Sequence, residues 1–321
     1  MTPVARTRKA RTNAVILVHG GVGSPLSWQD GCQQAVEAAR AVLQRTGDAL
    51  AAAVEAVRVM EDDGRYNAGS GSSLRLDGKT VEMDAAVMDS RGKLGAVAAI
   101  SRVRNPVLVA RAVADTPHVA LAGLGATIMA RKLGLAGAFR PSSFALERWR
   151  WWQGALQRRR AGEVPDDWRG FDLQRHWNFP TSYDAVFQPH DTVGAVVRGP
   201  DGGFAVASST GGASPMLRGR VGDVPFVGCG FYAGQHGAVA VTGVGEEIIR
   251  RMLARVVYDR LVAGAAPQVA CDEGVALVPA EIAVGAIAVS PAGWGVAANR
   301  EMACADGTFP APMRRGRSAS S

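Results

Sequence analysis

The sequence predicts an α/β fold in which two β-sheets are sandwiched between layers of helices. Short apolar runs typical of buried strands alternate with segments in which apolar residues recur every three or four positions, as in amphipathic helices. Strand-like segments also lie on both sides of a helical block in the second half of the chain. The length of 321 residues, with 47% hydrophobic residues, is sufficient for one large or two small domains.

The first half contains three strand-like and three helix-like segments. The strand-like segments are residues 14–18, 81–88 and 94–100. The helix-like segments are residues 29–46, residues 48–62 and a segment in which Pro106 occupies the first helical position. The glycines of residues 19–23 should end the first strand sharply, and residues 66–71 should form a loop.

The second half is organised around two β-hairpins. The first hairpin joins residues 192–198 to 204–209, and the second joins residues 282–289 to 295–298. A glycine-rich loop and two helices are expected between the hairpins. These helices span residues 246–263 and 267–273.

The composition changes between about residues 140 and 191. Five of the seven tryptophans and the run Arg158-Arg159-Arg160 lie here, with several prolines and no sustained periodicity. Arginine among aromatic residues could stack on single-stranded nucleic acid, but six acidic residues between Glu147 and Asp184 dilute the charge. We therefore predict a mobile connector, whose Trp- and Arg-rich part spans residues 144–177.

The formal net charge of +7 is concentrated at the two chain ends. It corresponds to Arg6, Arg8, Lys9, Arg11, Arg314, Arg315 and Arg317. A nucleic-acid surface should place a basic patch on the folded domain, and here the remainder of the chain is formally neutral. We predict that the protein does not bind nucleic acid, and a basic nucleic-acid-binding protein is the non-enzymatic alternative.

Neither membrane insertion nor a disulfide framework is expected. The chain has no run of about 18 apolar residues, and residues 14–18 are too short for the apolar part of a signal peptide. A cytoplasmic location without a membrane partner is therefore predicted. The cysteines are far apart without a C-x-x-C motif, so buried thiols are expected at Cys32, Cys229, Cys271 and Cys304.

Four short motifs follow one another in the second half, and their order is more specific than any of them alone. They are H-D-T-V-G (190–194), S-T-G-G (209–212), G-R-V-G-D (219–223) and V-T-G-V-G-E (241–246). The first half adds H-G-G-V-G (19–23), Y-N-A-G-S-G (66–71) and V-E-M-D-A-A-V-M-D (81–89). Over nearly its whole length the chain resembles the plant-type L-asparaginase and isoaspartyl peptidase family of N-terminal-nucleophile hydrolases. Glycosylasparaginase and threonine aspartase are relatives of this family.

The resemblance implies a four-layer αββα sandwich and a precursor that cuts itself between Asp191 and Thr192. The products would be an α chain of residues 1–191 and a β chain of residues 192–321, which together form one domain. A threonine hydroxyl is a poor nucleophile without an adjacent base, and a free α-amine with a pKa of about 7.7 to 8 can accept its proton. Without the surrounding motifs, Thr192 would be interpreted as a β-branched residue that opens a strand.

The resemblance also assigns residues around the nucleophile. Thr210 would hydrogen-bond Thr192, although a loop hydroxyl with local partners is the alternative. Thr242 and Gly243 would stabilise the oxyanion, although Thr242 could instead cap a helix. Asn67 matches a family asparagine near the nucleophile, and a simple turn residue is its alternative.

The same comparison predicts a site for the charged head of an amino acid. Arg220 would pair with an α-carboxylate and Asp223 with an α-ammonium, whereas a surface ion pair is the alternative. The substrate-binding residues would further include Val221, Gly222, Val244 and Gly245. Val244 replaces a polar residue that is common at this position of the family pattern.

The implied activity is hydrolysis of L-asparagine to aspartate and ammonia, and of β-aspartyl (isoaspartyl) dipeptides. Glycosylasparaginase activity is the alternative, because His190 and Asp191 precede Thr192 as they do in that relative. A fold without catalytic activity is a further alternative. No cofactor for catalysis and no metal-ligand set are predicted, but relatives carry a structural sodium ion held by loop carbonyls near residues 66–71. An (αβ)2 assembly is also implied.

Overall fold

The computed structural model describes residues 13–75, 77–158, 171–172, 174–179, 192–213 and 216–310. Its larger sheet has seven strands: β1 (Ala14–Val22), β2 (Met83–Asp89), β3 (Leu94–Ile100), β4 (Ala120–Ala122), β5 (Thr192–Arg198), β6 (Phe204–Thr210) and β11 (Met302–Phe309). Their order in the sheet is β11-β1-β5-β6-β2-β3-β4. The smaller sheet has the order β10-β9-β8-β7 and consists of β7 (Phe231–Gly234), β8 (Gly237–Gly243), β9 (Val284–Ser290) and β10 (Gly293–Ala298).

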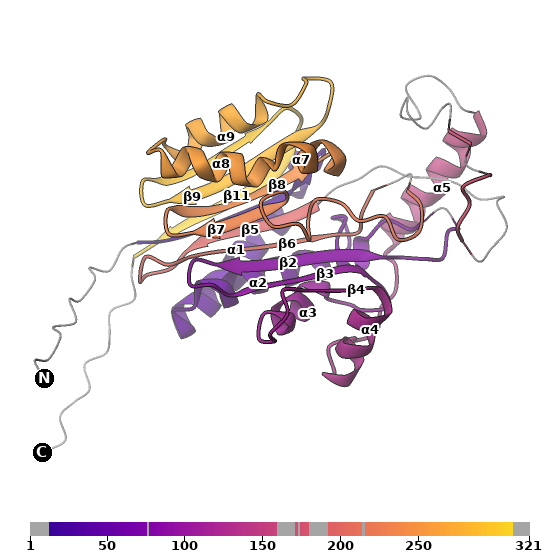
Figure 1. Cartoon of the computed structure of the whole chain (residues 1–321), viewed down its shortest axis with the longest axis horizontal. Helices are drawn as coiled ribbons and strands as arrows, with labels where there is room; N and C mark the ends of the chain where they lie inside the picture. The colour runs from indigo at the N-terminus through magenta and orange to yellow at the C-terminus, as the bar shows by residue number, and fades with distance from the viewer. Residues whose placement is uncertain are drawn as a thin grey trace, which may run out of the picture.

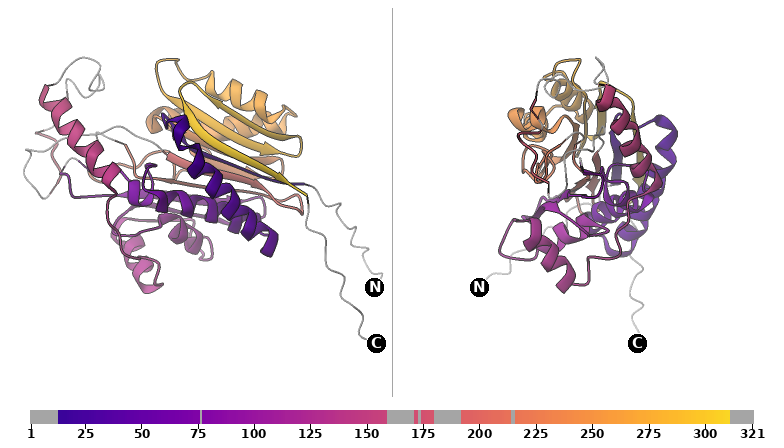
Figure 2. Two further views of the ribbon diagram at one scale, coloured as in Figure 1. Left: turned by 180° about the vertical axis from the view of Figure 1, so that it is seen from behind. Right: turned by 90° about the vertical axis from the view of Figure 1, so that its right-hand side faces the viewer.

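Helices cover the outer faces of the two sheets (Figures 1 and 2). Those of the first half are α1 (Gln29–Thr46), α2 (Ala49–Asp63), α3 (Pro106–Val113), α4 (Gly123–Lys132) and α5 (Ser143–Arg158), with short 3-10 turns at Leu26–Trp28 and Gly69–Gly71. Those of the second half are α7 (Gly245–Arg251), α8 (Leu253–Val262) and α9 (Pro267–Val275). Figure 1 shows α8 and α9 over the smaller sheet, whereas α1, α2 and α3 lie on the far side of the larger one.

Three hydrophobic clusters hold the helices and the two sheets together. Successive strand residues face opposite sides of a sheet, so one strand can contribute side chains to two clusters. On β5, Val197 packs in the cluster with α1–α3, whereas Val196 packs in the cluster between the two sheets. On β8, Ala240 belongs to the cluster between the sheets, whereas Val241 packs with Leu253 of α8. Both faces of β5 are therefore buried, which fixes the strand that begins at Thr192.

Most predicted elements are confirmed with small shifts of their boundaries. The helix of residues 29–46 has the expected ends, and Gly47 ends it with a φ of 69°. Asp48 then caps α2, since its carboxylate accepts a hydrogen bond of 2.8 Å from the backbone N–H of Leu50. The two predicted hairpins are β5–β6 and β9–β10.

Two predicted boundaries are wrong. The first strand does not end at the glycines but continues to Val22, because Gly21 takes a φ of 98° where the pairing with β11 shifts register. The helix expected over residues 246–263 is broken into α7 and α8. Met252 takes a left-handed conformation between them, with a φ of 48°.

Four strands lie outside the predicted elements, namely β4, β7, β8 and β11. The strands β7 and β8 come from the segment predicted as a glycine-rich loop. The strand β11 pairs antiparallel with β1 and places Phe309 opposite Ala14, so the two ends of the described chain are neighbours in the sheet. The sequence separation of this pair leaves no local turn signal for it.

The connector predicted without sustained periodicity begins with a helix, α5, which is a further correction. Ser142 caps it, because its hydroxyl accepts a hydrogen bond of 3.1 Å from the Ala145 N–H. That hydroxyl also donates to the Gly64 carbonyl at 2.6 Å, and Arg148 Nη1 donates to the Arg65 carbonyl at 3.0 Å. The helix is therefore attached to the loop that follows α2.

Several predictions concern residues outside the described ranges. They include the basic residues at both chain ends, Arg159, Arg160, His190 and Asp191. Of the four cysteines, three are buried as expected and Cys304 is half-buried. Within the described ranges, no helix combines the length and the apolar character that crossing a bilayer requires.

A carboxyl group is buried between α2 and the larger sheet. Glu61 is fully buried, and its Oε1 accepts hydrogen bonds from Ser209 Oγ at 2.7 Å and from the Val107 N–H at 3.0 Å. Burial raises the pKa of Glu61 to about 8, against an ordinary value of 4.5. At neutral pH the folded state therefore retains a proton that the unfolded state releases.

This proton makes the stability of the fold depend on pH. Because the folded pKa is raised, Glu61 stabilises the fold fully below pH 4.5, and this stabilisation is lost as the pH rises to about 8. Each pH unit in that interval costs up to about 1.4 kcal/mol from this group. We expect the loss of Tm between pH 5 and pH 8, measured by calorimetry, to be smaller in Glu61→Gln than in the wild type. Glu55→Gln on the same helix is the control, and an equal loss in all three proteins would refute the assignment.

Candidate active site

Thr192 is the first residue of β5 and belongs to a row of polar residues across three neighbouring strands. Thr210 of β6 lies opposite Thr192, and Asp84 of β2 lies opposite Thr210. All three residues are buried. The hydroxyl oxygens Oγ1 of Thr192 and Thr210 are 3.2 Å apart and hydrogen-bonded. The structure thus brings the two predicted threonines into direct contact.

The segment after Thr210 is held by hydrogen bonds from the first half of the chain. The Gly212 N–H donates back to Thr210 Oγ1 at 3.1 Å. Asn67 accepts from the Gly211 N–H with its backbone carbonyl at 2.8 Å and donates from Nδ2 to the Gly212 carbonyl at 2.7 Å. The described contacts of Asn67 therefore support the backbone next to Thr210.

A buried arginine that the sequence analysis does not single out reinforces this support. Arg75 is 1% exposed and donates from Nη1 to the Gly211 carbonyl at 3.0 Å. Its Nε lies 3.2 Å from Glu82 Oε2. Burial lowers the pKa of Arg75 to about 10, so the guanidinium remains charged at neutral pH and paired with Glu82.

Thr242 and Gly243 end β8 on the other sheet. A Cβ atom added to Gly194, two residues after Thr192, would lie 3.1 Å from the Cβ of Ala240, two residues before Thr242. The two strands therefore approach each other near their threonines. Thr242 Oγ1 accepts a hydrogen bond of 3.3 Å from the Val22 N–H, which leaves its hydroxyl proton free to be donated elsewhere.

The backbone conformation and the close packing at position 243 require a glycine. Its φ is 144°, and a Cβ at this position would lie 2.3 Å from the Ala283 carbonyl oxygen. The following residue, Val244, donates its N–H to the same carbonyl at 3.1 Å and is 39% exposed. The loop before β9 thus fixes the backbone of the predicted oxyanion residues.

Arg220 and Asp223 meet beside this segment. A Cβ on Gly245 would lie 2.8 Å from Arg220 Nη2 and 2.9 Å from Asp223 Oδ1. A Cβ on Gly222 would lie 2.8 Å from Arg220 Nη1. Both glycines therefore allow the two charged side chains to approach the backbone closely, and Val221 is half-buried between Arg220 and Gly222.

Asp223 is a buried carboxyl group with a raised pKa at this site. It is fully buried, and burial raises its pKa to about 7, although nearby Arg220 acts in the opposite direction. Its neighbour Asp84 is also buried with a raised pKa, and it accepts hydrogen bonds from the backbone N–H groups of Ala99 at 2.8 Å and Gly222 at 3.4 Å. Asp84 therefore connects the threonine row to the loop that carries Arg220.

Other acidic and basic side chains pack against the chain or form hydrogen bonds with it. His19 packs against Gly194, where an added Cβ would lie 2.4 Å from its Nε2, and burial lowers its pKa to about 3. This histidine is therefore neutral at physiological pH. The Glu82 carboxylate accepts a hydrogen bond from Arg75, whereas the Asp84 carboxylate accepts from the Ala99 N–H.

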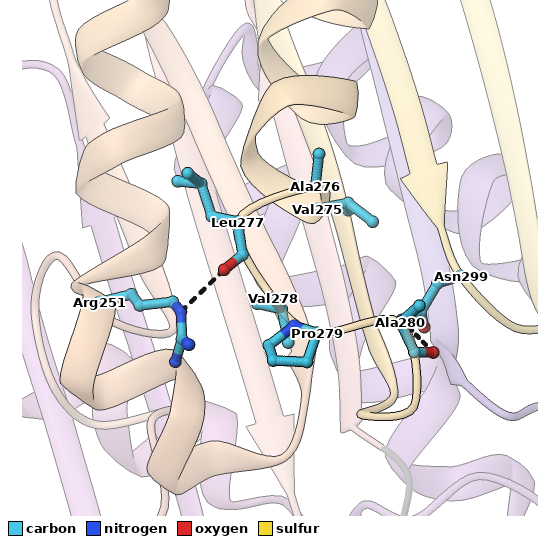
Figure 3. A pocket seen from close by; sticks show the side chains of 8 residues that line it. All are labelled: Arg251, Val275, Ala276, Leu277, Val278, Pro279, Ala280 and Asn299. Atoms are coloured by element: carbon cyan, nitrogen blue, oxygen red, sulfur yellow. Dashed lines mark hydrogen bonds between the residues drawn. The ribbon is translucent and has the colours of Figure 1, made fainter.

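A cavity of about 480 Å³ lies elsewhere, at the C-terminal end of α9 (Figure 3). It is lined by residues 275–280, Arg251 and Asn299. Figure 3 shows Arg251 bonded to the Leu277 carbonyl, at 3.1 Å between Nε and the oxygen. None of the threonines lines this cavity. The loop that lines it continues to Ala283, whose carbonyl accepts the hydrogen bond from the Val244 N–H.

Among the described residues, no cluster of three or more His, Cys, Asp or Glu side chains could hold a metal ion. The loop near residues 66–71 offers backbone carbonyls, several of which accept hydrogen bonds from the chain itself. The Arg65 and Gly71 carbonyls accept from Arg148, and the Gly64 carbonyl accepts from Ser142. These hydrogen bonds fix the position of the loop in the described part of the chain.

Comparisons with known proteins show the family of the chain. The sequence profile of a family described as Asparaginase matches residues 12–308. An isoaspartyl peptidase/L-asparaginase of Danio rerio is 39% identical over 272 residues, which are 80% of this chain and 79% of the relative. A plant-type L-asparaginase of Pyrobaculum calidifontis is 40% identical over 256 residues, with 77% and 79% covered. An isoaspartyl peptidase of Salmonella typhimurium is 39% identical over 254 residues, with 75% and 76% covered. The chain therefore belongs to the asparaginase family that contains the plant-type L-asparaginases and the isoaspartyl peptidases.

Proposed function

We propose that this chain is the precursor of an N-terminal-nucleophile hydrolase with the four-layer αββα arrangement, and that it cuts itself between Asp191 and Thr192. The mature enzyme hydrolyses L-asparagine and β-aspartyl dipeptides. The observation that carries this proposal is the 3.2 Å contact between the hydroxyls of Thr192 and Thr210 at the buried start of β5. The names of the relatives support the same two substrates.

The reaction follows from the groups around Thr192. Its hydroxyl attacks the side-chain carbonyl carbon of the substrate, while its freed α-amine accepts the hydroxyl proton. The oxygen that becomes negative is stabilised by the Thr242 hydroxyl and the Gly243 N–H. Collapse of this intermediate breaks the C–N bond, returns the proton to the leaving nitrogen and leaves a β-aspartyl ester on Thr192. A water molecule, deprotonated by the same amine, then opens the ester and releases aspartate.

Arg220 and Asp223 position the substrate for this attack. The guanidinium pairs with the α-carboxylate of the aspartyl group, and the Asp223 carboxylate pairs with its α-ammonium. Neither side chain takes part in proton transfer. No step of the reaction is assigned to a sodium ion, and we propose that such an ion has a structural role. We also propose that the mature enzyme assembles as (αβ)2.

Mass spectrometry of the purified protein tests the proposal directly. A fragment that begins at Thr192 is expected, together with its N-terminal complement. Turnover of a β-aspartyl dipeptide should exceed that of a glycosylated asparagine. The opposite preference would favour glycosylasparaginase, which the residues His190 and Asp191 before the cut suggest, and an uncut inactive protein would favour a fold without catalytic function.

The pH dependence of KM offers a separate prediction. Below its pKa of about 7, Asp223 is neutral and cannot pair with an α-ammonium, so KM for a β-aspartyl dipeptide should rise as the pH falls from 8 to 6. Asp223→Asn should raise KM by about 100-fold at pH 8 and by less at pH 6, and it should remove this dependence.

Steady-state kinetics at several pH values provide the test. The kcat profile should remain pH-dependent in Asp223→Asn, because it follows the α-amine of Thr192. Asp259→Asn, which removes an exposed partner of Arg255 on α8, is the matched control. An unchanged KM profile in Asp223→Asn would contradict the assignment.

A further inference from the structure

The Arg220 guanidinium already binds a carboxylate of its own chain. Its Nε donates to Glu246 Oε1 at 2.9 Å, and its Nη2 donates to Glu246 Oε2 at 2.7 Å. These two parallel bonds form a bidentate pair, the geometry in which arginine binds carboxylates most specifically. Glu246 is one residue after Gly245 and was not among the predicted site residues.

This pairing leaves one edge of the guanidinium for a ligand. An arginine has five N–H donors, and Glu246 uses one on Nε and one on Nη2. The edge formed by Nη1 and Nη2 retains three donors and can take a second carboxylate. Gly222 and Gly245 lie so close to these two nitrogens that a Cβ atom on either glycine would come within 2.8 Å of one of them.

Three carboxyl groups surround the single guanidinium of Arg220. Glu246, Asp223 and Asp84 all interact with this single guanidinium, whereas Arg75 and Glu82 nearby form a pair of their own. Asp223 is 4% exposed, but the Glu246 side chain is 50% exposed. Glu246 is therefore the acidic group of this set that an incoming ligand meets from the solvent.

We propose that Glu246 is a specificity-determining residue of the proposed substrate site. It holds Arg220 so that one edge faces the ligand, and its charge selects head groups that carry an α-ammonium beside the α-carboxylate. A zwitterionic head adds no net charge next to Glu246. A ligand with the carboxylate alone adds an uncompensated negative charge, and at the short separations within such a site this repulsion weakens its binding.

This inference rests on the proposed function and is tested with two ligands that share an amide and a carboxylate but differ in the α-ammonium. The first is a β-aspartyl dipeptide, whose KM is measured. The second is succinamic acid, which keeps the amide and the carboxylate but lacks the α-ammonium, and is measured as a competitive inhibitor. In Glu246→Gln the inhibition constant of succinamic acid should fall about tenfold, while KM for the dipeptide should change less than about threefold.

Two further variants separate charge from shape. Glu246→Asp retains the negative charge and should keep the selectivity of the wild type. Glu273→Gln on α9 removes a carboxylate that is likewise 50% exposed and paired with an arginine, Arg260, and it should change neither constant. A purely structural role of Glu246 would instead change both constants in parallel in Glu246→Gln.

The acid side of the kcat/KM profile provides a second readout. The Glu246 carboxylate contributes to the raised pKa of Asp223, together with Asp84 and the dominant effect of burial, while Arg220 opposes them. The acid limb should therefore move to lower pH in Glu246→Gln. Equal effects on the two ligands, or an unmoved acid limb, would overturn the inference alone. Wild-type protein that neither turns over the dipeptide nor binds either ligand would overturn the proposed function and this inference with it.

Discussion

Replacing Thr192 with alanine is expected to leave a single uncut chain and to lower amidase activity by about 10⁴-fold or more. The variant lacks the hydroxyl that, in the proposed mechanism, attacks both the Asp191 carbonyl in the precursor and the substrate in the mature enzyme. Because the α-amine of residue 192 stays in a peptide bond, the base is also missing. Removal of one side chain thus disables two successive reactions.

The measurement combines an intact-mass spectrum with turnover of a β-aspartyl dipeptide. Thr192→Ser is the matched variant, since it keeps the hydroxyl and should still be cut, with reduced rates. Thr192 packs at the buried start of β5, so circular dichroism and Tm should accompany both variants to verify folding. A Thr192→Ala protein that is cut at the same bond, or that retains full amidase activity, would contradict the mechanism.

Replacing Arg220 with alanine should lower kcat/KM by about 10³-fold, which corresponds to about 4 kcal/mol of lost binding. The loss is large because the substrate carboxylate would enter the site without its only guanidinium partner. Arg220→Lys should recover only part of the loss, since an ammonium supplies the charge but not the planar fork of donors.

Self-cleavage separates this effect from misfolding. Arg220 lies with Asp223 and Gly245 rather than in the threonine row, so the Arg220→Ala chain should still be cut before Thr192. Arg255→Ala, which removes an exposed partner of Asp259 on α8, should leave the kinetics unchanged. An Arg220→Ala enzyme that is cut and retains a wild-type KM would show that the substrate carboxylate binds elsewhere.

Local sequence patterns predict the strands and helices that carry the site. They predict the long-range contacts that hold these elements together less accurately. The hairpin that begins at Thr192 is evident from its alternating apolar residues and its glycine-rich turn. The strand β11 is not, because its pairing with β1 joins opposite ends of the chain. The break at Met252 is likewise invisible in a periodic segment, since methionine rarely takes a left-handed backbone.

The charged residues that support the site are likewise hard to predict from local sequence patterns. Arg75 reads as an ordinary surface residue in the sequence, because arginine is rarely buried. Its partner Gly211 is 136 positions away, and only the completed sheet brings the two together. Glu246 offered a weak signal, since it ends the V-T-G-V-G-E motif, but its bond to Arg220 spans 26 residues. Motif order thus indicated the groups that we propose bind the substrate, whereas the residues that orient them required the fold.

The pairing of β1 with β11 also bears on how the chain could be rearranged. Ala14 lies opposite Phe309, so a short linker could join the two ends of the described domain without crossing the sheet. A circularly permuted gene could then begin translation at Thr192, provided that the initiator methionine is removed. Such a protein would present the amine of Thr192 at once, and catalysis would no longer depend on the proposed cut before Thr192.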